Sequence, residues 1–272
     1  TTAYLPVTVA GVADAPTLSV QAATGNEDTA IALNISSALT DTDGSETLIL
    51  KIAGVPAMAT LSAGTKNQDG SWSLTPDQLS GLKVTPPANF SGVMDLVVTA
   101  ISSESGTTAQ TQATLHVTVA GVADAPTLSV HAASGQEDHA IALSITSALT
   151  DASESLSITI TGVPNLATLS AGTKNPDGSW TLSPAELSGL TITPPQNSDA
   201  DFVLTVTATS TDGASTAYTA ATLPVTVNGV ADTPSLVLSA ASGLEDHAIP
   251  LAVAATLNDT DGSETLTVTI SG

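Results

Sequence analysis

The stretch GVADAP at residues 11–16 decides how this chain is organised. It returns unchanged at 121–126 and as GVADTP at 229–234. Its aspartates, Asp14, Asp124 and Asp232, therefore stand 110 and 108 residues apart. A period of that length is the length of a whole domain. We expect the phrase to mark the joint between consecutive domains.

Other phrases repeat in the same order. Residues 54–82 and 162–190 are nearly identical, and EDTAIAL at 27–33 returns as EDHAIAL at 137–143 and EDHAIPL at 245–251. The acidic run DTDGSE at 41–46 returns at 259–264 and is shortened by two residues at 151–154. We assign residues 1–12 to the last strand of one repeat, 13–121 and 122–229 to two full repeats, and 230–272 to the first strands of another.

Within a repeat, apolar and polar residues alternate with a period of two. Examples are residues 7–9, 31–35, 115–119, 204–207 and 223–227, which are rich in β-branched side chains and are typical of half-buried strands. Asp-Gly turns separate the runs, and only 76–81 and 184–189 predict a short helical turn. About seven strands per repeat predict an all-β fold of tandem antiparallel β-sandwiches of the immunoglobulin-like kind.

The composition restricts the partners. The chain has 26 acidic and 4 basic residues, and its net charge is −22. Nucleic acid and anionic membrane surfaces are bound through basic residues, so neither is expected, whereas cations are. Cysteine is absent, which excludes disulfides and thiolate chemistry. No apolar run approaches the roughly 18 residues of a membrane-spanning helix, so we expect no membrane insertion.

In such a sandwich, each acidic loop is expected at one of the two ends of the repeat. The linker aspartate, the loop 41–46 and the last hairpin, with Glu104 or Asp212, are expected where a repeat begins, and Glu27-Asp28 at the opposite end. At the joint around Asp124 the expected group is Glu27, Asp28, Asp124, Asp151, Glu154 and Asp212. Carboxylates gathered without a basic residue repel one another unless a cation lies between them.

Calcium is the cation that this pattern favours. Ca²⁺ takes six to eight oxygen ligands, whereas Mg²⁺ demands tighter octahedral geometry and keeps its waters. The alternative is a solvated acidic surface that holds no ion. The predicted calcium ligands at the three joints are Asp14, Glu27, Asp28, Asp41, Asp43, Glu46, Glu104, Asp124, Glu137, Asp138, Asp151, Glu154, Asp212, Asp232, Asp259, Asp261 and Glu264.

The whole chain resembles the tandem extender repeats of giant bacterial RTX adhesins, which are exported by type I secretion. The phrases that carry the resemblance are GVADAP, DTDGSE, LSAGT followed by DGSW, SPAELSGL and TPPANFSG. The resemblance implies immunoglobulin-like and cadherin-like domains joined by calcium, located outside the cell at the bacterial surface. The glycine-rich nonapeptides of RTX tails are absent from this sequence.

Animal cadherins are similar in placing calcium between an acidic linker, a DxD loop and acids of the preceding domain. Asp41-Thr42-Asp43 and Asp259-Thr260-Asp261 match the DxD pattern, whereas Asp151-Ala152-Ser153 does not. The resemblance therefore leaves the number of ions or the affinity at the middle joint in question.

Aromatic side chains and two turns allow two interpretations each. Trp72 and Trp180 are expected in the core, since a ring buries on the order of 200 Å², and the alternative is a sugar-stacking platform. Phe90 and Phe202 are also expected in the core. Residues 67–70 and 175–178 are expected to form hairpin turns, and the alternative is a further ion site.

No catalytic residue is predicted, and the chain is not expected to be an enzyme. His139 and His247 each follow Glu-Asp, but Thr29 stands at the matching position of the first repeat, and no spacing typical of zinc ligands is present. His116 and His131 are expected on strands. Nothing resembles the strand-turn-helix motif of a serine nucleophile.

The expected function is structural. The chain is expected to be a monomeric rod of repeats whose partners are calcium and the neighbouring repeats, and which projects a distal binding domain for attachment or biofilm formation. The alternative is that the repeats bind glycans or one another directly.

Overall fold

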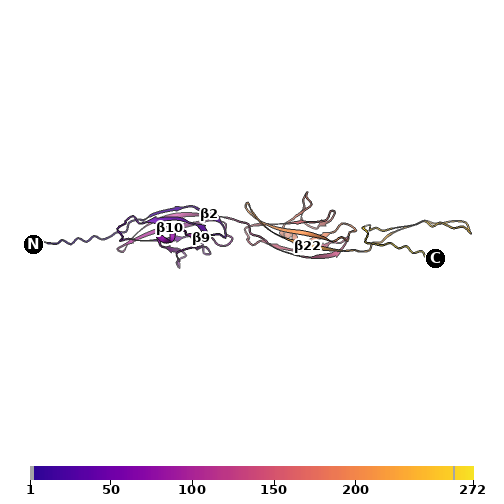
Figure 1. The fold of residues 1–272 in the computed structure, drawn as a ribbon, viewed down its shortest axis with the longest axis horizontal. Coiled ribbons are helices and arrows are strands. Elements are labelled where there is room, and N and C mark those ends of the chain that lie inside the picture. The colour runs from indigo at the N-terminus through magenta and orange to yellow at the C-terminus, as the bar shows by residue number, and fades with distance from the viewer. Residues whose placement is uncertain (1–2, 260) are drawn as a thin grey trace. The chain divides into compact units, whose positions relative to one another are not determined.

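The structure, a computed structural model, describes residues 3–259 and 261–272. Its contacts divide the chain into two compact units, of which the first ends at Val122 and the second begins at Ala123. Each unit contains one complete sandwich (Figure 1). Residues 1 and 2, part of the strand expected at 1–12, lie outside the described residues.

The first sandwich follows the strand pattern of its sequence. Its elements are β1 (Thr17–Gln21), β2 (Ala23–Asn26), β3 (Ile31–Ala32), β4 (Asn34–Ala38), β5 (Thr47–Ala53), β6 (Thr60–Leu61), β7 (Thr65–Lys66), β8 (Trp72–Leu74), η1 (Pro76–Leu79), β9 (Lys83–Thr85), β10 (Gly92–Glu104) and β11 (Thr107–Ala120). The long hairpin β10–β11 is the largest pairing, and it runs from Gly92↔Val119 to Glu104↔Thr107.

Two layers of strands enclose the core. One layer is the six-stranded sheet β2-β11-β10-β5-β8-β7, and the other consists of β1-β4 and β3-β9-β6. The order β11-β10-β5 corresponds to the G-F-C order of an immunoglobulin-like sandwich. Strand β2 pairs in parallel with β11, which brings the start of the repeat beside its last strand. The prediction of an all-β sandwich is confirmed.

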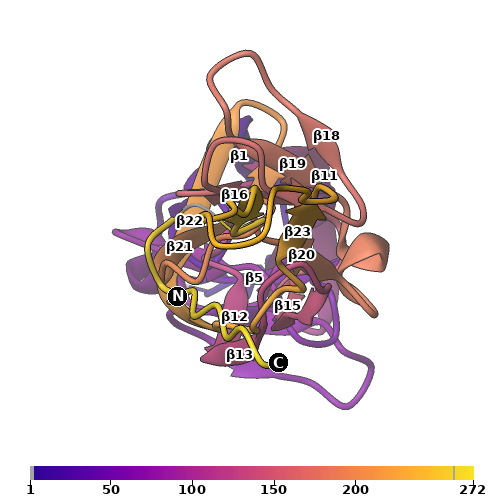
Figure 2. The ribbon, with the colours of Figure 1, turned by 90° about the vertical axis from the view of Figure 1, so that its right-hand side faces the viewer.

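The second sandwich repeats this arrangement. Its elements are β12 (Thr127–His131), β13 (Ala133–Gln136), β14 (Ile141–Ala142), β15 (Ser144–Ala148), β16 (Ser155–Thr161), β17 (Thr168–Leu169), β18 (Thr173–Lys174), β19 (Trp180–Leu182), η2 (Pro184–Leu187), β20 (Thr191–Thr193), β21 (Phe202–Asp212) and β22 (Ser215–Asn228). Figure 2 shows β16, β19 and β18 following one another, as their pairing requires. The second unit also contains the paired strands β23 (Ser235–Leu238) and β24 (Val253–Thr256), which lie in the segment 230–272 that was expected to begin a further repeat.

Each sandwich has its own apolar core, to which the alternating strands contribute every second residue. Trp72 and Trp180 are 9% and 8% exposed and belong to these cores, so the core interpretation is confirmed and the sugar-stacking platform is wrong. Phe90 and Phe202 pack against the cores from their margins.

The short helical turns predicted at 76–81 and 184–189 are the 3₁₀ turns η1 and η2. The predicted hairpin turn at 67–70 is also formed: Asn67 accepts the N–H of Gly70, and its own N–H binds Ser71 O. The same two bonds occur at Asn175.

Two expected strands differ in the structure. Residues 3–16 form no strand, because the alternating residues 7–9 have no partner strand among the described residues, whereas their counterparts in β11 and β22 pair with β10 and β21. The run 31–35 is divided into β3 and β4 at Leu33, because β3 pairs with β9 and β4 with β1. The Leu33 N–H bridges the division by donating to Leu82 O.

Candidate metal centre at the linkers

In each repeat, a glutamate binds the backbone of the linker that precedes the repeat. The Asp14 N–H donates to Glu46 Oε1 at 2.6 Å, and the Asp124 N–H donates to Glu154 Oε1 at 2.5 Å. In the third linker the Asp232 N–H donates in the same way to Glu264. Glu46 and Glu154 are each 7% exposed. The last residue of the acidic loop therefore holds the linker backbone in all three repeats.

A second glutamate binds the linker from the preceding repeat. Glu27 Oε1 accepts the Val122 N–H, and Glu137 Oε1 accepts the Val230 N–H, both at 2.6 Å. Both carboxylates are nearly completely buried, at 3% and 2% exposed. Glu137 is fixed further because its own N–H donates to Asn228 O at the end of β22.

These glutamates each use one oxygen and leave the other buried. The Oε2 atoms of Glu46, Glu137, Glu154 and Glu264 are inaccessible and have no hydrogen-bond partner among the described residues. The same holds for Asp212 Oδ2. An unpaired buried carboxylate oxygen is costly. It is also the donor that a hard cation binds, and the set contains oxygen ligands alone, as calcium requires. The residues present therefore fit a calcium ion.

The strongest concentration of carboxylates lies at the third linker. Ligand atoms of Glu137, Asp259 and Asp261 all lie within 4.8 Å of one another. Asp259 is 2% exposed. They come from the loop after β13 and the loop after β24, which are far apart in sequence. The structure thus brings together three of the residues predicted as calcium ligands.

The neighbouring carboxylates affect the pKa of Glu137. The Val230 N–H stabilises the carboxylate, but burial and the nearby Asp259, Asp138 and Asp261 carboxylates outweigh it, so the pKa of Glu137 is raised above its ordinary value. The pKa of Asp261 is lowered, mainly because the N–H of Ser263 donates to its Oδ1. Within this group, the negative charge is therefore disfavoured at Glu137 and favoured at Asp261.

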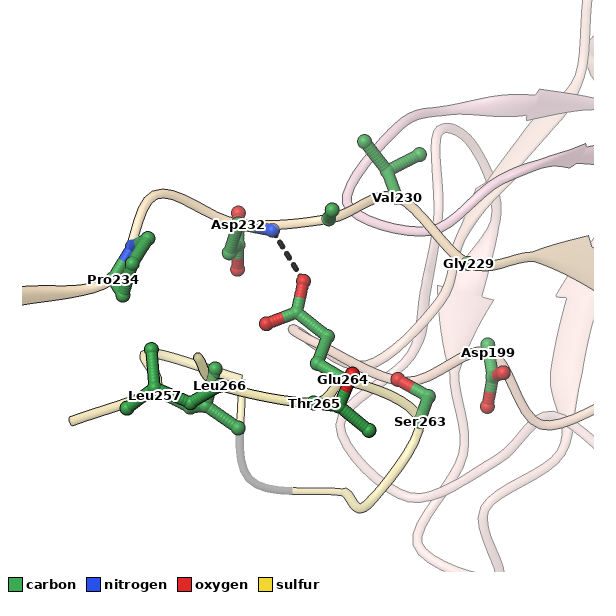
Figure 3. A pocket seen from close by; sticks show the side chains of 11 residues that line it. Asp199, Gly229, Val230, Asp232, Pro234, Leu257, Ser263, Glu264, Thr265 and Leu266 are labelled. Atoms are coloured by element: carbon green, nitrogen blue, oxygen red, sulfur yellow. Dashed lines mark hydrogen bonds between the residues drawn. The ribbon is translucent and has the colours of Figure 1, made fainter. Parts of the chain in front are cut away.

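The third linker also borders a cavity of about 390 Å³. Figure 3 shows Glu264 directed at the Asp232 backbone, with Asp199 and Ser263 on one side. Asp199 was not among the predicted ligands. Its N–H donates to Asp261 Oδ2 at 3.4 Å, and a Cβ on Gly229 would stand 3.5 Å from Asp199 Oδ2. The available signal was the acidic run SDAD at 198–201, which stands where the first repeat has FSGV at 90–93.

Asn197 is a second residue that sequence reasoning missed. Its side-chain amide donates to Asp232 Oδ2 at 3.2 Å and to Asn258 O at 3.0 Å, and its N–H donates to Asp138 Oδ1 at 2.8 Å. In the first unit the Asn89 N–H likewise donates to Asp28 Oδ1. These two asparagines and two aspartates all have φ between 54° and 56°. Positive φ in residues other than glycine is uncommon and concentrates at functional sites.

Three further predicted ligands, Asp41, Asp43 and Asp151, lie in the acidic loops, and Glu104 is the last residue of β10. Asp41 and Asp43 cap the backbone of their own loop, at the N–H groups of Asp43 and Ser45. Asp151 does the same at Ser153 and is 6% exposed. Glu104 lies against the first linker, where a Cβ on Gly11 would stand 1.8 Å from Glu104 Oε1.

The group expected around Asp124 is divided between the two units. Glu27 and Asp28 belong to the first unit, and Asp124, Asp151, Glu154 and Asp212 to the second. That the two halves meet around one ion stays a prediction.

The histidines take part in local hydrogen bonds. His139 Nδ1 lies 2.9 Å from Glu137 O, and His247 Nδ1 lies 3.1 Å from Glu245 O. His116 pairs with Asp95 at 2.7 Å on the surface of the β10–β11 hairpin. Within residues 3–259 and 261–272, no histidine joins a group of three side chains able to hold a metal.

Comparison with known proteins gives similarity in solved structures only. No protein-family description matches the sequence, and no curated protein sequence is similar to it. Titin domains Z1Z2 in complex with telethonin are 11% identical with a TM-score of 0.33, and cover 81% of this chain and 100% of their own. Drosophila N-cadherin EC1-4 is 17% identical with a TM-score of 0.37, and covers 79% of this chain and 50% of its own.

An endo-fucoidan hydrolase is 20% identical with a TM-score of 0.24, and covers 68% of this chain and 24% of its own. Superpositions this loose carry no argument about function. In the described part of the chain, no helix has the length and apolar character needed to cross a bilayer.

Proposed function

We propose that this chain is a spacer segment of a bacterial cell-surface adhesin of the RTX class, in which calcium stiffens the joints between repeats. The spacer holds a distal binding domain away from the cell for attachment or biofilm formation. The parent protein is exported by type I secretion and works outside the cell, where calcium modules commonly bind at roughly 10⁻⁴ to 10⁻³ M.

One observation carries this proposal: the two carboxylate oxygens of the glutamates that bind the linkers have different environments. In Glu46, Glu137, Glu154 and Glu264, one oxygen accepts a linker N–H, and the other is buried with no hydrogen-bond partner among the described residues. An ion that binds the second oxygen supplies the positive charge that the acidic loops lack. The same carboxylate would then hold both the ion and the linker backbone, so the ion would join the linker to the acidic loops on both of its sides.

At the third linker, Glu137, Asp259 and Asp261 would hold the ion, with Asp199, Asp232 and Glu264 beside them. Glu137 comes from the repeat before the linker, whereas Asp259 and Asp261 come from the segment after it. A cation bound by all three therefore ties the two sides of the linker together, which is the mechanical task of a spacer joint.

Replacing Glu137 by Gln tests the proposal. The amide oxygen can still accept the Val230 N–H, but the charge is lost. At calcium concentrations of about 100 times the dissociation constant, binding stabilises the folded protein by about 2.7 kcal/mol. We expect calcium to raise the melting temperature of the unaltered chain by on the order of 10 °C, and the Glu137→Gln joint to contribute none of this gain.

The metal-free variant is expected to be at least as stable as the unaltered chain, because Glu137 is a buried charge beside other carboxylates. Asp77→Asn, at an exposed acid in η1, is the matched control and should keep the full response. A calorimetric calcium titration in which Glu137→Gln binds as many ions as the unaltered chain would contradict the proposal.

The main residues that could have bound a glycan in the alternative function are not accessible. Trp72 and Trp180 are buried and cannot stack on a sugar. Tyr218, on β22, is 71% exposed, but the matching position of the first repeat is Gln110. A glycan array with the intact chain separates the two functions, since a spacer binds none of the sugars.

A further inference from the structure

The linker is bound by more than its glutamate. In the first unit, four further backbone groups of residues 13–16 form hydrogen bonds with side chains of the repeat. The Ala13 N–H donates to Thr107 Oγ1 at 2.8 Å, and Ser102 Oγ donates to Asp14 O at 2.5 Å. Two further hydroxyls donate to the next carbonyls, Thr40 to Ala15 O and Thr111 to Pro16 O.

The second unit builds the same set from its own residues. The Ala123 N–H donates to Ser215 Oγ at 3.1 Å, and Ser210 Oγ donates to Asp124 O. Thr150 Oγ1 donates to Ala125 O at 3.1 Å, and Thr219 Oγ1 donates to Pro126 O at 2.7 Å. With Glu46 and Glu154, the two linkers are therefore held by five equivalent side chains each.

Ser102 and Ser210 are polar residues at positions that belong to the buried face of their strands. Both are 0% exposed and lie on the inward face of β10 and β21, in line with Val98, Ala100 and their counterparts. An apolar residue is expected there by alternation, because burial of a hydroxyl is unfavourable unless it forms a hydrogen bond. Here each hydroxyl serves the linker carbonyl.

We propose that these side chains form a clamp that makes the linker, from Ala13 or Ala123 onward, a fixed part of the repeat that follows, whether or not calcium is bound. The clamp consists of Thr40, Glu46, Ser102, Thr107 and Thr111 in the first repeat, and of Thr150, Glu154, Ser210, Ser215 and Thr219 in the second. It goes beyond the calcium role and does not depend on it, because all of its bonds are made by the protein.

The clamp residues are positioning residues: they fix the backbone that carries Asp14 or Asp124 before any ion arrives. Fixing the backbone in advance removes the ordering cost that a flexible linker would incur on binding. If the clamp residues have this role, removing one of their hydroxyls should free the linker while the sandwich stays folded.

Amide hydrogen exchange in excess chelator tests the clamp. We expect the Ala13, Asp14, Ala123 and Asp124 amides to exchange slowly in the metal-free chain, because each donates to a side chain of the folded repeat. Ser102→Ala is expected to speed exchange at Ala13 and Asp14 about five- to tenfold, the equivalent of one hydrogen bond. Ala123 and Asp124 in the same molecule should not change.

A second pair of variants guards against a general effect on folding. Thr111→Val removes the hydroxyl with little change of shape and should also speed exchange at the first linker, whereas Thr111→Ser keeps the hydroxyl and should restore protection. Thr118→Val, at an exposed position of β11, is the matched control.

Two results would overturn the clamp. One is rapid exchange of the four linker amides in the unaltered metal-free chain. The other is unchanged exchange in both Ser102→Ala and Thr111→Val. Since no calcium is present, neither result bears on the proposed calcium role, which the Glu137→Gln titration tests separately.

Discussion

At the scale of single residues, the two repeats provide comparisons within one chain. Asp69 and Asp177 occupy the same turn, and each accepts the N–H and hydroxyl of a serine two residues on. Asp69 differs by an ion pair of 2.8 Å with Lys51, where the second repeat has Thr159. Lys51 is the first cause, and Ser71 the second, that lowers the pKa of Asp69 well below its ordinary value.

This difference predicts a pH effect in the first repeat. A depressed carboxyl pKa contributes stability above the unfolded pKa of about 3.9, and this stability is lost as the pH falls through the folded pKa. We expect an NMR titration to place the midpoint of Asp69 below that of Asp177. Lys51→Thr should raise the Asp69 midpoint to that of Asp177, whose pKa is lowered chiefly by the hydrogen bonds of Ser179. Equal midpoints in the unaltered chain would contradict the role given to Lys51.

At the scale of elements, glycine sets the distance between neighbouring strands. Gly162 directly follows β16 and has φ of +81°, and a Cβ there would stand 2.5 Å from Val203 O at the start of β21. Gly54 has the same environment beside Asp95 O. These glycines let the ends of the paired strands approach closely.

Gly162→Ala is therefore expected to be strongly destabilising. The positive φ alone costs about 1–3 kcal/mol for a residue other than glycine, and contact with a backbone oxygen adds to it. Gly178→Ala is the matched control, because Gly178 has φ of +87° and no atom within 4 Å of its Cβ position. Chemical denaturation followed by Trp180 fluorescence should show the larger loss for Gly162→Ala, and equal losses would mean that close approach has no role.

At the scale of the whole molecule, the proposed function concerns stiffness. Removing calcium would let the acidic loops repel one another and would release each linker from the repeat before it, so the metal-free chain should sample bent arrangements. We expect small-angle scattering to give a shorter mean end-to-end distance in chelator than in calcium, with Glu137→Gln in calcium lying between the two. Superimposable profiles with and without chelator would exclude the spacer mechanism.

The occupancy of the proposed calcium sites would also differ between the cytosol and the outside of the cell, because the calcium concentrations differ. The proposed joints would be empty at low cytosolic calcium and filled outside, where concentrations match a dissociation constant of roughly 10⁻⁴ to 10⁻³ M. The buried oxygens of Glu46, Glu137 and Glu154, which have no hydrogen-bond partner in the part of the chain that the structure describes, would then destabilise the chain before export and bind the ion after it.

The sequence by itself determined the period, the class of fold and the residue types at the joints. Strand alternation and Asp-Gly turns depend on neighbours within a few residues, so the sandwich, the 3₁₀ turns and the buried Trp72 and Trp180 could all be predicted. Repetition also pointed to the acidic loops, because the same phrases recur in the same order.

Only the tertiary structure decided which groups meet. Pairing partners determine whether an alternating run becomes a strand, so residues 3–16 form none, and they also split 31–35 at Leu33. The roles of Asn197, Asp199, Ser102 and Ser210 depend on contacts across about 35 to 90 positions of the chain. Burial then made the decisive difference for the glutamates, because only folding removes water from one oxygen while giving the other to a linker N–H.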